Sequence, residues 1–517
     1  MRYLKYFSYL LLVCLFTASC TKLQNENSSI VPLDKALNSI DDLRLYVYSL
    51  YKPFASSNGD DQVWGFYATL DAGYYSITDN TTDILTTQKA NASSVPTLCN
   101  LHNWQLNSSN LMNPLTNKYW SKVTYISKAR MAAIRINATS FEPSIKKPYV
   151  AEAKAVIGWL GMILYDVFGP VPFATDEQLI AWDKDPLSST HLPKPTDQQF
   201  LAYIESNLQE AIPDLPVKQA DWGRITKASA TMMLMRIHFM QRDYVKAKSD
   251  AEALYAMGVP GGGTTYNLQD EYQNIFKLSN AKNNEIIQAI PCDGSKDGSP
   301  NQWYCAAMPK DYPHISPNAK GSSTHRMRWA YYDTYELTDD RLKTIVSKYT
   351  NTSGTVVLRG KGELTGGAIP FKYDQDPNTN GNFAHNDVVV FRYAEVLLSY
   401  AEAINEISGP TAQAVELVNK VRRRAKLKNL QDIFPAKIAT QAAFRGAILE
   451  ERGHELYCEG VRHMDLVRYG KFVQNGKLGL STSDQALYNI DPLRYRFPIP
   501  PDAVIQSGGV IKQNDGY

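Results

Sequence analysis

The stretch 448–470, ILEERGHELYCEGVRHMDLVRYG, places two histidines, a cysteine and four glutamates in one helical pattern. His454 and Cys458 are four residues apart and share a helical face, so a metal site is one interpretation. A zinc protease of the H-E-x-x-H type needs a second histidine where this chain has Cys458. Gly460 also separates His463 from the other two side chains. We therefore favour a structural role, in which the stretch holds helices together.

Oppositely charged residues three positions apart support this structural role, because that spacing brings side chains together on a helix. The expected pairs are Glu455 with Arg452, Glu459 with Arg462, and Asp465 with Arg462 or Arg468. Partly buried pairs of this kind fix the register of helices without adding much net stability. His238, within MRIHFM, is likewise predicted to be a packed histidine.

Helical periodicity extends outward from this stretch. Apolar residues recur at three-to-four spacing in four segments, which are 112–170, 226–258, 391–425 and 441–470. Turns at 241–243 and 408–410 divide two of them into helix-turn-helix units of roughly tetratricopeptide length. Long insertions between the units argue against a regular array. The sequence predicts a mainly α fold, a tetratricopeptide-like scaffold with a large irregular, loop-rich half.

The loop-rich part comprises segments 56–110 and 292–390, which are rich in Gly, Asn, Asp, Ser, Thr and Pro. Loops of this length are usually functional or disordered. Disordered segments are poor in aromatic residues, whereas these contain several tryptophans and many tyrosines. We expect them to be ordered and to carry ligand-binding groups.

Composition argues against several classes of protein. The 517 residues carry a formal net charge of +2, which gives no reason to expect a nucleic-acid partner. The chain has no GxxxxGK[ST] loop and no G-x-S-x-G elbow, and no local motif selects a pair of catalytic carboxylates. We expect neither catalysis nor a cofactor, although a secreted enzyme is retained as a minor alternative.

The first twenty residues indicate export. Arg2 and Lys5 precede an apolar run from about Phe7 to Phe16, which is too short to span a membrane. The small residues Ala18 and Ser19 stand directly before Cys20, as in a bacterial lipoprotein. We predict a signal peptide over 1–19, lipidation of Cys20, and a polar tether over 20–32. A plain secretory signal is the alternative.

Cysteine spacing leaves one question open. After processing, Cys292 and Cys305 remain close enough in sequence to form a disulfide, which their spacing permits but does not require. The sequence does not decide whether calcium is bound.

Four segments occur in a specific order: HNDVVVFRYAEVLLSYAEAINEISG at 385–409, VNKVRRRAKL at 418–427, EERGHELYCEGVRHMDLVRYG at 450–470 and RFPIPPDAVIQSGGVIKQNDGY at 496–517. Their order resembles that of the SusD/RagB family, lipid-anchored outer-membrane nutrient-binding proteins of Bacteroidetes-type bacteria. The resemblance implies one SusD-like fold over 33–517. It also implies a SusC-like TonB-dependent outer-membrane transporter as partner, with the helices facing the transporter and the loops facing the ligand. It further implies a lipid-anchored protein at the cell exterior, although the acidic cluster that often follows the lipidated cysteine is reduced here to Glu26.

A sugar ring has an apolar face and a polar rim, so it is bound by exposed aromatic rings flanked by polar side chains. Stretches 58–83 and 301–332 offer both. The candidate ligand-binding residues are Trp64, Tyr67, Tyr74, Tyr75, Trp303, Tyr304, Tyr312 and Trp329. The alternative is that half or more of them pack within the loops. An oligosaccharide is the expected ligand; a peptide, or a helical adaptor without a small ligand, are the alternatives.

Overall fold

The computed structural model describes residues 37–56, 65–67, 73–87, 99, 112–258, 266–295, 298–480 and 492–517. The signal peptide, tether and lipidation at Cys20 predicted above lie outside these residues. The chain divides into two units, 1–43 and 44–517, and the account that follows concerns the second.

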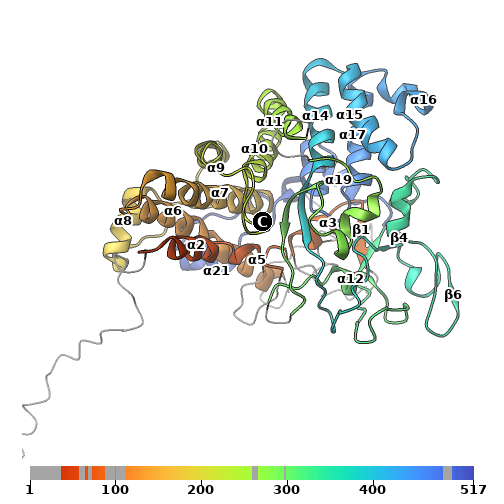
Figure 1. Cartoon of the computed structure of the whole chain (residues 1–517), viewed down its shortest axis with the longest axis horizontal. Helices are drawn as coiled ribbons and strands as arrows, with labels where there is room; N and C mark the ends of the chain where they lie inside the picture. Colours follow the sequence, from red (N-terminus) through yellow and green to blue (C-terminus); the bar gives the residue numbers. More distant parts are fainter. Residues whose placement is uncertain are drawn as a thin grey trace, which may run out of the picture. The chain divides into compact units, whose positions relative to one another are not determined.

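Helices dominate the second unit and follow one another in a row from α6 and α7 through α9, α10 and α11 to α14, α15 and α17 (Figure 1). The mainly α, tetratricopeptide-like fold predicted from the sequence is confirmed. The longer helices are α5 (Met112–Trp120), α6 (Thr124–Asn137), α7 (Pro143–Phe168), α8 (Asp176–Lys184), α9 (Asp197–Ala211), α10 (Lys227–Gln241), α11 (Tyr244–Met257), α14 (Tyr393–Ser408), α15 (Ala412–Arg424) and α17 (Gln441–Glu455). Shorter helices are α2 (Ile40–Ser49), α3 (Tyr74–Asp79), α12 (Trp303–Ala307), α13 (Trp329–Tyr332), α16 (Leu430–Ile433), α18 (Arg462–Arg468), α19 (Phe472–Gly476) and α21 (Pro501–Gln506).

Glycines let α7 and α9 approach closely. A Cβ atom at Gly158 would lie 2.4 Å from Leu208 Cγ, and one at Gly161 would lie 2.3 Å from Ile204 Cγ2. Because real Cβ atoms never come so near, the two glycines permit this packing. The helix then ends at Gly169, whose φ of 76° suits a residue without a side chain.

Local signals set the helix ends. Thr175 and Thr196 each form a capping box with the glutamine three residues later, at the starts of α8 and α9. The sequence analysis did not identify these two helices, although the Thr-Asp-x-Gln pattern marks both. The predicted turns are found: α10 and α11 are joined through Arg242, and α14 ends before Gly409.

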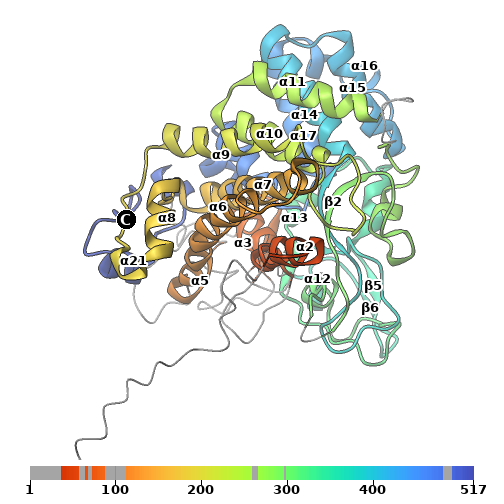
Figure 2. The same ribbon diagram turned by 60° about the vertical axis from the view of Figure 1, so that its left-hand side comes forward.

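The loop-rich half contains short two-stranded antiparallel sheets in place of one continuous sheet. Figure 2 shows its segments with α12, β5 and β6 below α14, α15 and α17. The strands are β1 (Leu85–Thr87), β2 (Ile286–Ile290), β3 (His325–Met327), β4 (Ile345–Val346), β5 (Tyr349–Thr350), β6 (Val356–Val357), β7 (Ile369–Pro370) and β8 (Val388–Arg392). The pairs are β1 with β3, β2 with β8, β4 with β7 and β5 with β6.

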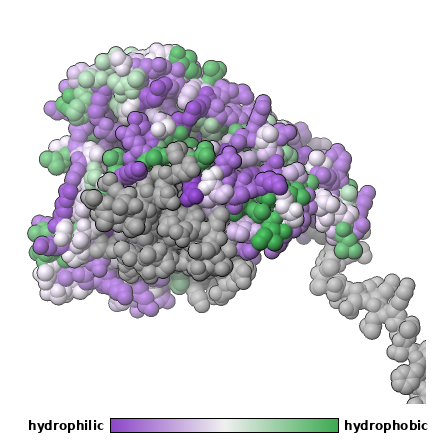
Figure 3. All heavy atoms as spheres, turned by 180° about the vertical axis from the view of Figure 1, so that it is seen from behind, coloured by the Kyte–Doolittle hydropathy of each residue, from purple (hydrophilic) through white to green (hydrophobic). Residues whose placement is uncertain are grey.

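Two main groups of buried side chains correspond to the two kinds of structure. The larger fills the space between the helices and includes Trp159, which is fully buried. The smaller lies among the loops around Tyr272, Trp303 and Tyr457. On the face that Figure 3 shows, the surface of the described residues is mainly hydrophilic, and hydrophobic residues lie there in small groups. Among the described residues, none of the helices combines the length and hydropathy that a membrane crossing requires.

Candidate functional site

The two loop stretches predicted to bind ligand lie against each other. β1 pairs with β3 in the register Leu85 to Met327, and the backbone N–H of Arg328 donates to the carbonyl of Ile84 at 2.9 Å. Ser76 Oγ lies 3.2 Å from His325 Nε2 in the same region. Residues far apart in sequence are thus held together by main-chain hydrogen bonds.

The three tyrosines of the first stretch lie in the interior. Tyr67, Tyr74 and Tyr75 are only 1–3% exposed. Tyr67 accepts a hydrogen bond from Trp159 Nε1 at 2.8 Å, and Tyr75 donates to the carbonyl of Val389 at 2.6 Å. Burial raises the pKa of Tyr67 above its ordinary value. These positions favour the alternative stated above, packing within the fold.

Trp303 and Tyr304 of the second stretch are also buried, at 1% and 3% exposure. The Trp303 ring stacks on His325 with centroids 5.0 Å apart, and its Nε1 donates to the carbonyl of Pro370 at 3.1 Å. An indole enclosed in this way offers no free face to a ligand. The expected ligand contact at Trp303 is therefore replaced by a core position, because the short helix α12 carries the ring inward.

Tyr312 and Trp329 are partly exposed, and Trp64 lies outside the described residues. Trp329 donates from Nε1 to the carbonyl of Leu364 at 3.1 Å, and the Arg359 guanidinium lies 4.4 Å from its ring centroid. Asp333 holds Arg359 in a bidentate pair at 2.6 and 2.8 Å. One face of the indole is thus covered by a cation, so a ligand would stack there only after Arg359 moves.

The ring of Tyr312 is partly exposed and has polar groups around it. It lies 6.2 Å from the His314 ring and 5.3 Å from the Tyr349 ring, measured between centroids. Tyr304 binds His314 Nδ1 at 2.9 Å and donates to Gln375 at 2.8 Å. Burial lowers the pKa of His314, which favours the neutral imidazole, and its Nε2 is buried without a hydrogen-bond partner among the described residues. We call Tyr312, His314 and Gln375 the tyrosine–histidine patch.

This patch has the chemistry of a neutral, polar binding surface. A partly exposed phenol ring offers an apolar face, and the partly exposed Gln375 side chain offers an amide beside it. The sequence analysis identified Tyr312 but missed His314 and Gln375. The only signal in the sequence for His314 and Gln375 is that each stands near an aromatic residue in the chain.

The stretch 448–470 forms the structural centre predicted for it, through different ion pairs. Arg392 on β8 is fully buried and binds three carboxylates, Glu285 at 2.9 Å, Glu459 at 2.8 Å, and Glu455. Of the expected local pairs, only Asp465 with Arg468 is present, at 2.8 Å. The pairs Glu455 with Arg452 and Glu459 with Arg462 are wrong. The chain turns at Cys458 and Gly460, both at positive φ, so Glu459 and Arg462 do not share a helix and the three-residue spacing does not apply to them. Arg452 and Glu455 do share α17, but Arg452 binds Asp465 and Glu455 binds Arg392.

The two histidines of this stretch, His454 and His463, have separate surroundings. His454 stacks on Tyr335 with centroids 4.1 Å apart, and burial together with nearby arginines lowers its pKa well below the ordinary value. His463 instead binds Asp166 at 3.0 Å. Within the described part of the chain, no three His, Cys, Asp or Glu side chains gather as they would around a metal ion. His238 is packed as predicted, 2% exposed, beside Asp250 and Glu205.

The structure also answers whether Cys292 and Cys305 form a disulfide. Cys292 and Cys305 are free thiols. Cys292 Sγ lies 3.5 Å from Ser56 Oγ, and Cys305 Sγ lies 3.4 Å from the carbonyl of Gly381. The two sulfur atoms therefore contact different segments, and the possible disulfide is not formed.

Comparison with known proteins shows similarity to one family. The model of the SusD family, SusD_RagB, matches residues 346–517, which include Arg392 and its partners Glu455 and Glu459. The starch-binding protein SusD of Bacteroides thetaiotaomicron is 25% identical over 68% of this chain and 70% of its own length. SusD-like protein P2 of Formosa agariphila is 26% identical over 68% of this chain and 71% of its own length. The C-terminal third of the chain thus matches the SusD family, and about two thirds of the chain is similar to SusD and SusD-like proteins.

Solved structures show the SusD-like fold along nearly the whole chain. A SusD homolog from Bacteroides thetaiotaomicron has a TM-score of 0.76 at 20% identity and covers 94% of this chain and 98% of its own. Surface glycan-binding protein A from the same organism, in complex with laminarihexaose, has a TM-score of 0.70 at 18% identity and covers 92% and 99%. The SusD family model begins at residue 346, so the tyrosine–histidine patch lies mostly before the segment that it matches.

Proposed function

We propose that this protein is a non-catalytic, lipid-anchored glycan-binding protein of the outer membrane. It delivers oligosaccharide to a SusC-like TonB-dependent transporter. Support comes from the similarity to a starch-binding SusD over 68% of the chain and from the fold shared with a protein crystallised with laminarihexaose. The export signal and Cys20 support the anchor.

The observation that carries the proposal is the tyrosine–histidine patch on the loop-rich half. The helices and the buried aromatic rings account for the core, whereas Tyr312 keeps part of its ring accessible beside a neutral histidine. A neutral glycan needs an apolar face to stack on and uncharged hydrogen-bond groups around it. Because the site is open and the ligand must be ordered on binding, we expect a Kd of roughly micromolar to millimolar.

The test uses protein lacking residues 1–20 in an affinity-gel or glycan-array screen, followed by titration of the best glycan. Tyr312→Ala should weaken binding at least about tenfold while leaving the melting temperature nearly unchanged. Tyr125→Ala, on the half-buried face of α6, is the matched control and should bind like the wild type.

Three results would count against this function. One is binding of peptides but not glycans, which would favour the peptide alternative. Another is steady cleavage of the bound glycan, which would make the protein an enzyme. The third is unchanged glycan affinity after Tyr312→Ala, which would place the site elsewhere.

A further inference from the structure

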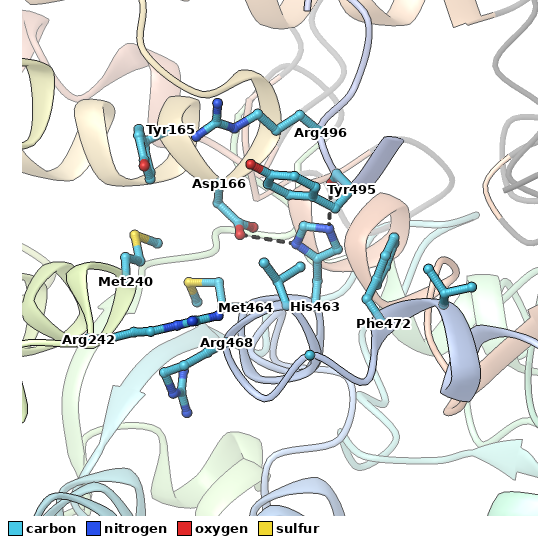
Figure 4. A pocket seen from close by; sticks show the side chains of 13 residues that line it. Tyr165, Asp166, Met240, Arg242, His463, Met464, Arg468, Phe472, Tyr495 and Arg496 are labelled. Atoms are coloured by element: carbon cyan, nitrogen blue, oxygen red, sulfur yellow. Dashed lines mark hydrogen bonds and ion pairs between the residues drawn. The ribbon is translucent and has the colours of Figure 1, made fainter. Parts of the chain in front are cut away.

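A cavity outside the loop-rich half lies between α7, the end of α10, α18, α19 and the segment at Tyr495 and Arg496 (Figure 4). It has a volume of about 460 Å³. Cavities that hold small organic molecules in proteins are typically about 300–1,000 Å³. The cavity therefore has the size of a ligand site.

The walls are apolar and partly aromatic. They are formed by Met240, Met464, Val467, Phe472, Val473, Tyr165 and Tyr495. Methionine side chains adapt to irregular ligand shapes, and the tyrosine rings offer flat faces. A ligand with an apolar or aromatic body fits such walls.

Buried polar groups beneath these walls are already satisfied. Asp166 accepts a hydrogen bond from Tyr74 at 2.8 Å and lies 3.0 Å from His463 Nδ1, while His463 Nε2 lies 3.0 Å from the carbonyl of Tyr495 (Figure 4). Burial alone would lower the pKa of His463, but the Asp166 carboxylate raises it above its ordinary value. Both ring nitrogens of His463 face oxygen atoms, an arrangement that favours the protonated imidazole and offsets the charge of Asp166 at the floor of the cavity.

Arg242 supplies an uncommitted positive charge at the rim. It is exposed, and no carboxylate forms an ion pair with it among the described residues. It stands at the turn after α10 with φ of 59°, a left-handed conformation that glycine or asparagine adopts more easily. Arginine at such a position suggests that its side chain, and not only its backbone, has a role.

Arg496 lies across the cavity and has one donor group to spare. Its Nη2 binds Asp197, and its Nε is buried without a hydrogen-bond partner in the described part of the chain, so Nη1 is the group left to meet a ligand. The guanidinium lies 5.0 Å from the Tyr165 ring centroid and 5.3 Å from that of Tyr495. Arg468, by contrast, is held by Glu402 at 2.7 Å and by Asp465 at 2.8 Å.

We propose that this cavity binds a small organic anion, an apolar or aromatic body bearing one carboxylate. The body packs between Met240, Met464 and the tyrosines, and the carboxylate receives hydrogen bonds from Arg242 and Arg496. The site is independent of the proposed glycan site because it lies among the helices and requires a charge that a neutral sugar lacks.

The first experiment uses 4-fluorophenylacetate as a probe in ¹⁹F NMR titration with protein lacking residues 1–20. Binding in the millimolar range or tighter is expected. The neutral analogue 4-fluorophenylacetamide should bind at least about tenfold more weakly, because it has the same body without the charge. Absence of binding by the acid, or equal binding of acid and amide, would overturn the proposal.

The second experiment locates the site with variants. Arg242→Gln should weaken binding of the acid about tenfold without lowering the melting temperature, since Arg242 has no ion pair to lose. Arg423→Gln, an exposed arginine on α15, is the matched control and should leave binding unchanged. Val467→Trp should fill the cavity and also abolish binding. Retained affinity in both cavity variants would refute the site, whereas loss of glycan binding by Tyr312→Ala with acid binding intact would keep the two sites distinct.

Discussion

Arg462, the first residue of α18, holds Asp83 in a bidentate pair across 379 positions of sequence. Nε lies 2.9 Å from Oδ1 and Nη2 lies 2.8 Å from Oδ2, and both side chains are only 5% exposed. Burial alone would raise the pKa of Asp83, but the Arg462 charge and hydrogen bonds from Arg462 and Asn475 lower it below its ordinary value. The carboxylate is therefore buried and charged, and depends on this arginine.

Arg462→Ala should lower the free energy of unfolding by about 3 kcal/mol, because it leaves a buried carboxylate without its cation. Urea denaturation measures the change. Arg423→Ala is the control: its pair with Glu416 is about half exposed, so the loss should be below about 1 kcal/mol. Stoichiometric zinc in the purified protein, lost on His454→Ala, would contradict the structural role of this stretch.

Lys122 makes stability depend on pH in the alkaline range. It is buried against Phe66 and Tyr119, and burial, with a smaller contribution from Lys118, lowers its pKa to about 7. In the unfolded chain the ammonium stays protonated to about pH 10. Between about pH 7 and pH 10 the unfolded state binds more protons, so this group makes the free energy of unfolding rise with pH.

Lys122→Met should remove that rise. The variant's advantage in stability over the wild type should be largest at about pH 7 and below, and should shrink toward pH 10. Thermal unfolding across this range measures it. A constant difference between the two proteins would show that Lys122 is not buried as the structure has it.

Trp303→Ala should destabilise the protein by about 3–5 kcal/mol, because it empties a fully buried site. This reverses the expectation for a ligand-stacking tryptophan, which would lose affinity and keep its melting temperature. Trp303→Phe, which leaves less empty space, should cost less. An unchanged melting temperature in Trp303→Ala would return this residue to the list of ligand contacts.

Cys20→Ala should move the protein from the membrane fraction to the soluble fraction, because the predicted lipidation attaches the acyl chains at that thiol. Detergent-free fractionation of cells measures the change. Ser19→Ala is the control. It keeps a small residue before the cysteine, so the protein should stay in the membrane fraction. Retention of the Cys20 variant with the membranes would contradict the lipoprotein prediction.

The helices were predictable because their signals are local. Apolar spacing and turn residues such as Gly169 and Gly409 are written within a few positions of the ends that they mark. The ion pairs were not predictable in the same way. Arg392 binds Glu285, 107 positions earlier, and no local spacing contains that information.

The aromatic residues show the same limit at the candidate site. An aromatic residue among Asn, Asp and Gly has the same sequence context whether it faces a ligand or the interior. Tyr67 and Tyr312 were equivalent candidates, yet the side chain of Tyr67 is buried and that of Tyr312 is partly exposed. The difference depends on which distant segments cover each ring.

The distance between Asp83 and Arg462 in the sequence has a consequence for biosynthesis. When the segment around Asp83 has been synthesised, Arg462, which supplies the cation that it needs, has not yet been made. That segment has to wait, with its carboxylate in water, until almost the entire polypeptide is complete. A chain truncated before α18 would leave this part unfinished and open to proteases.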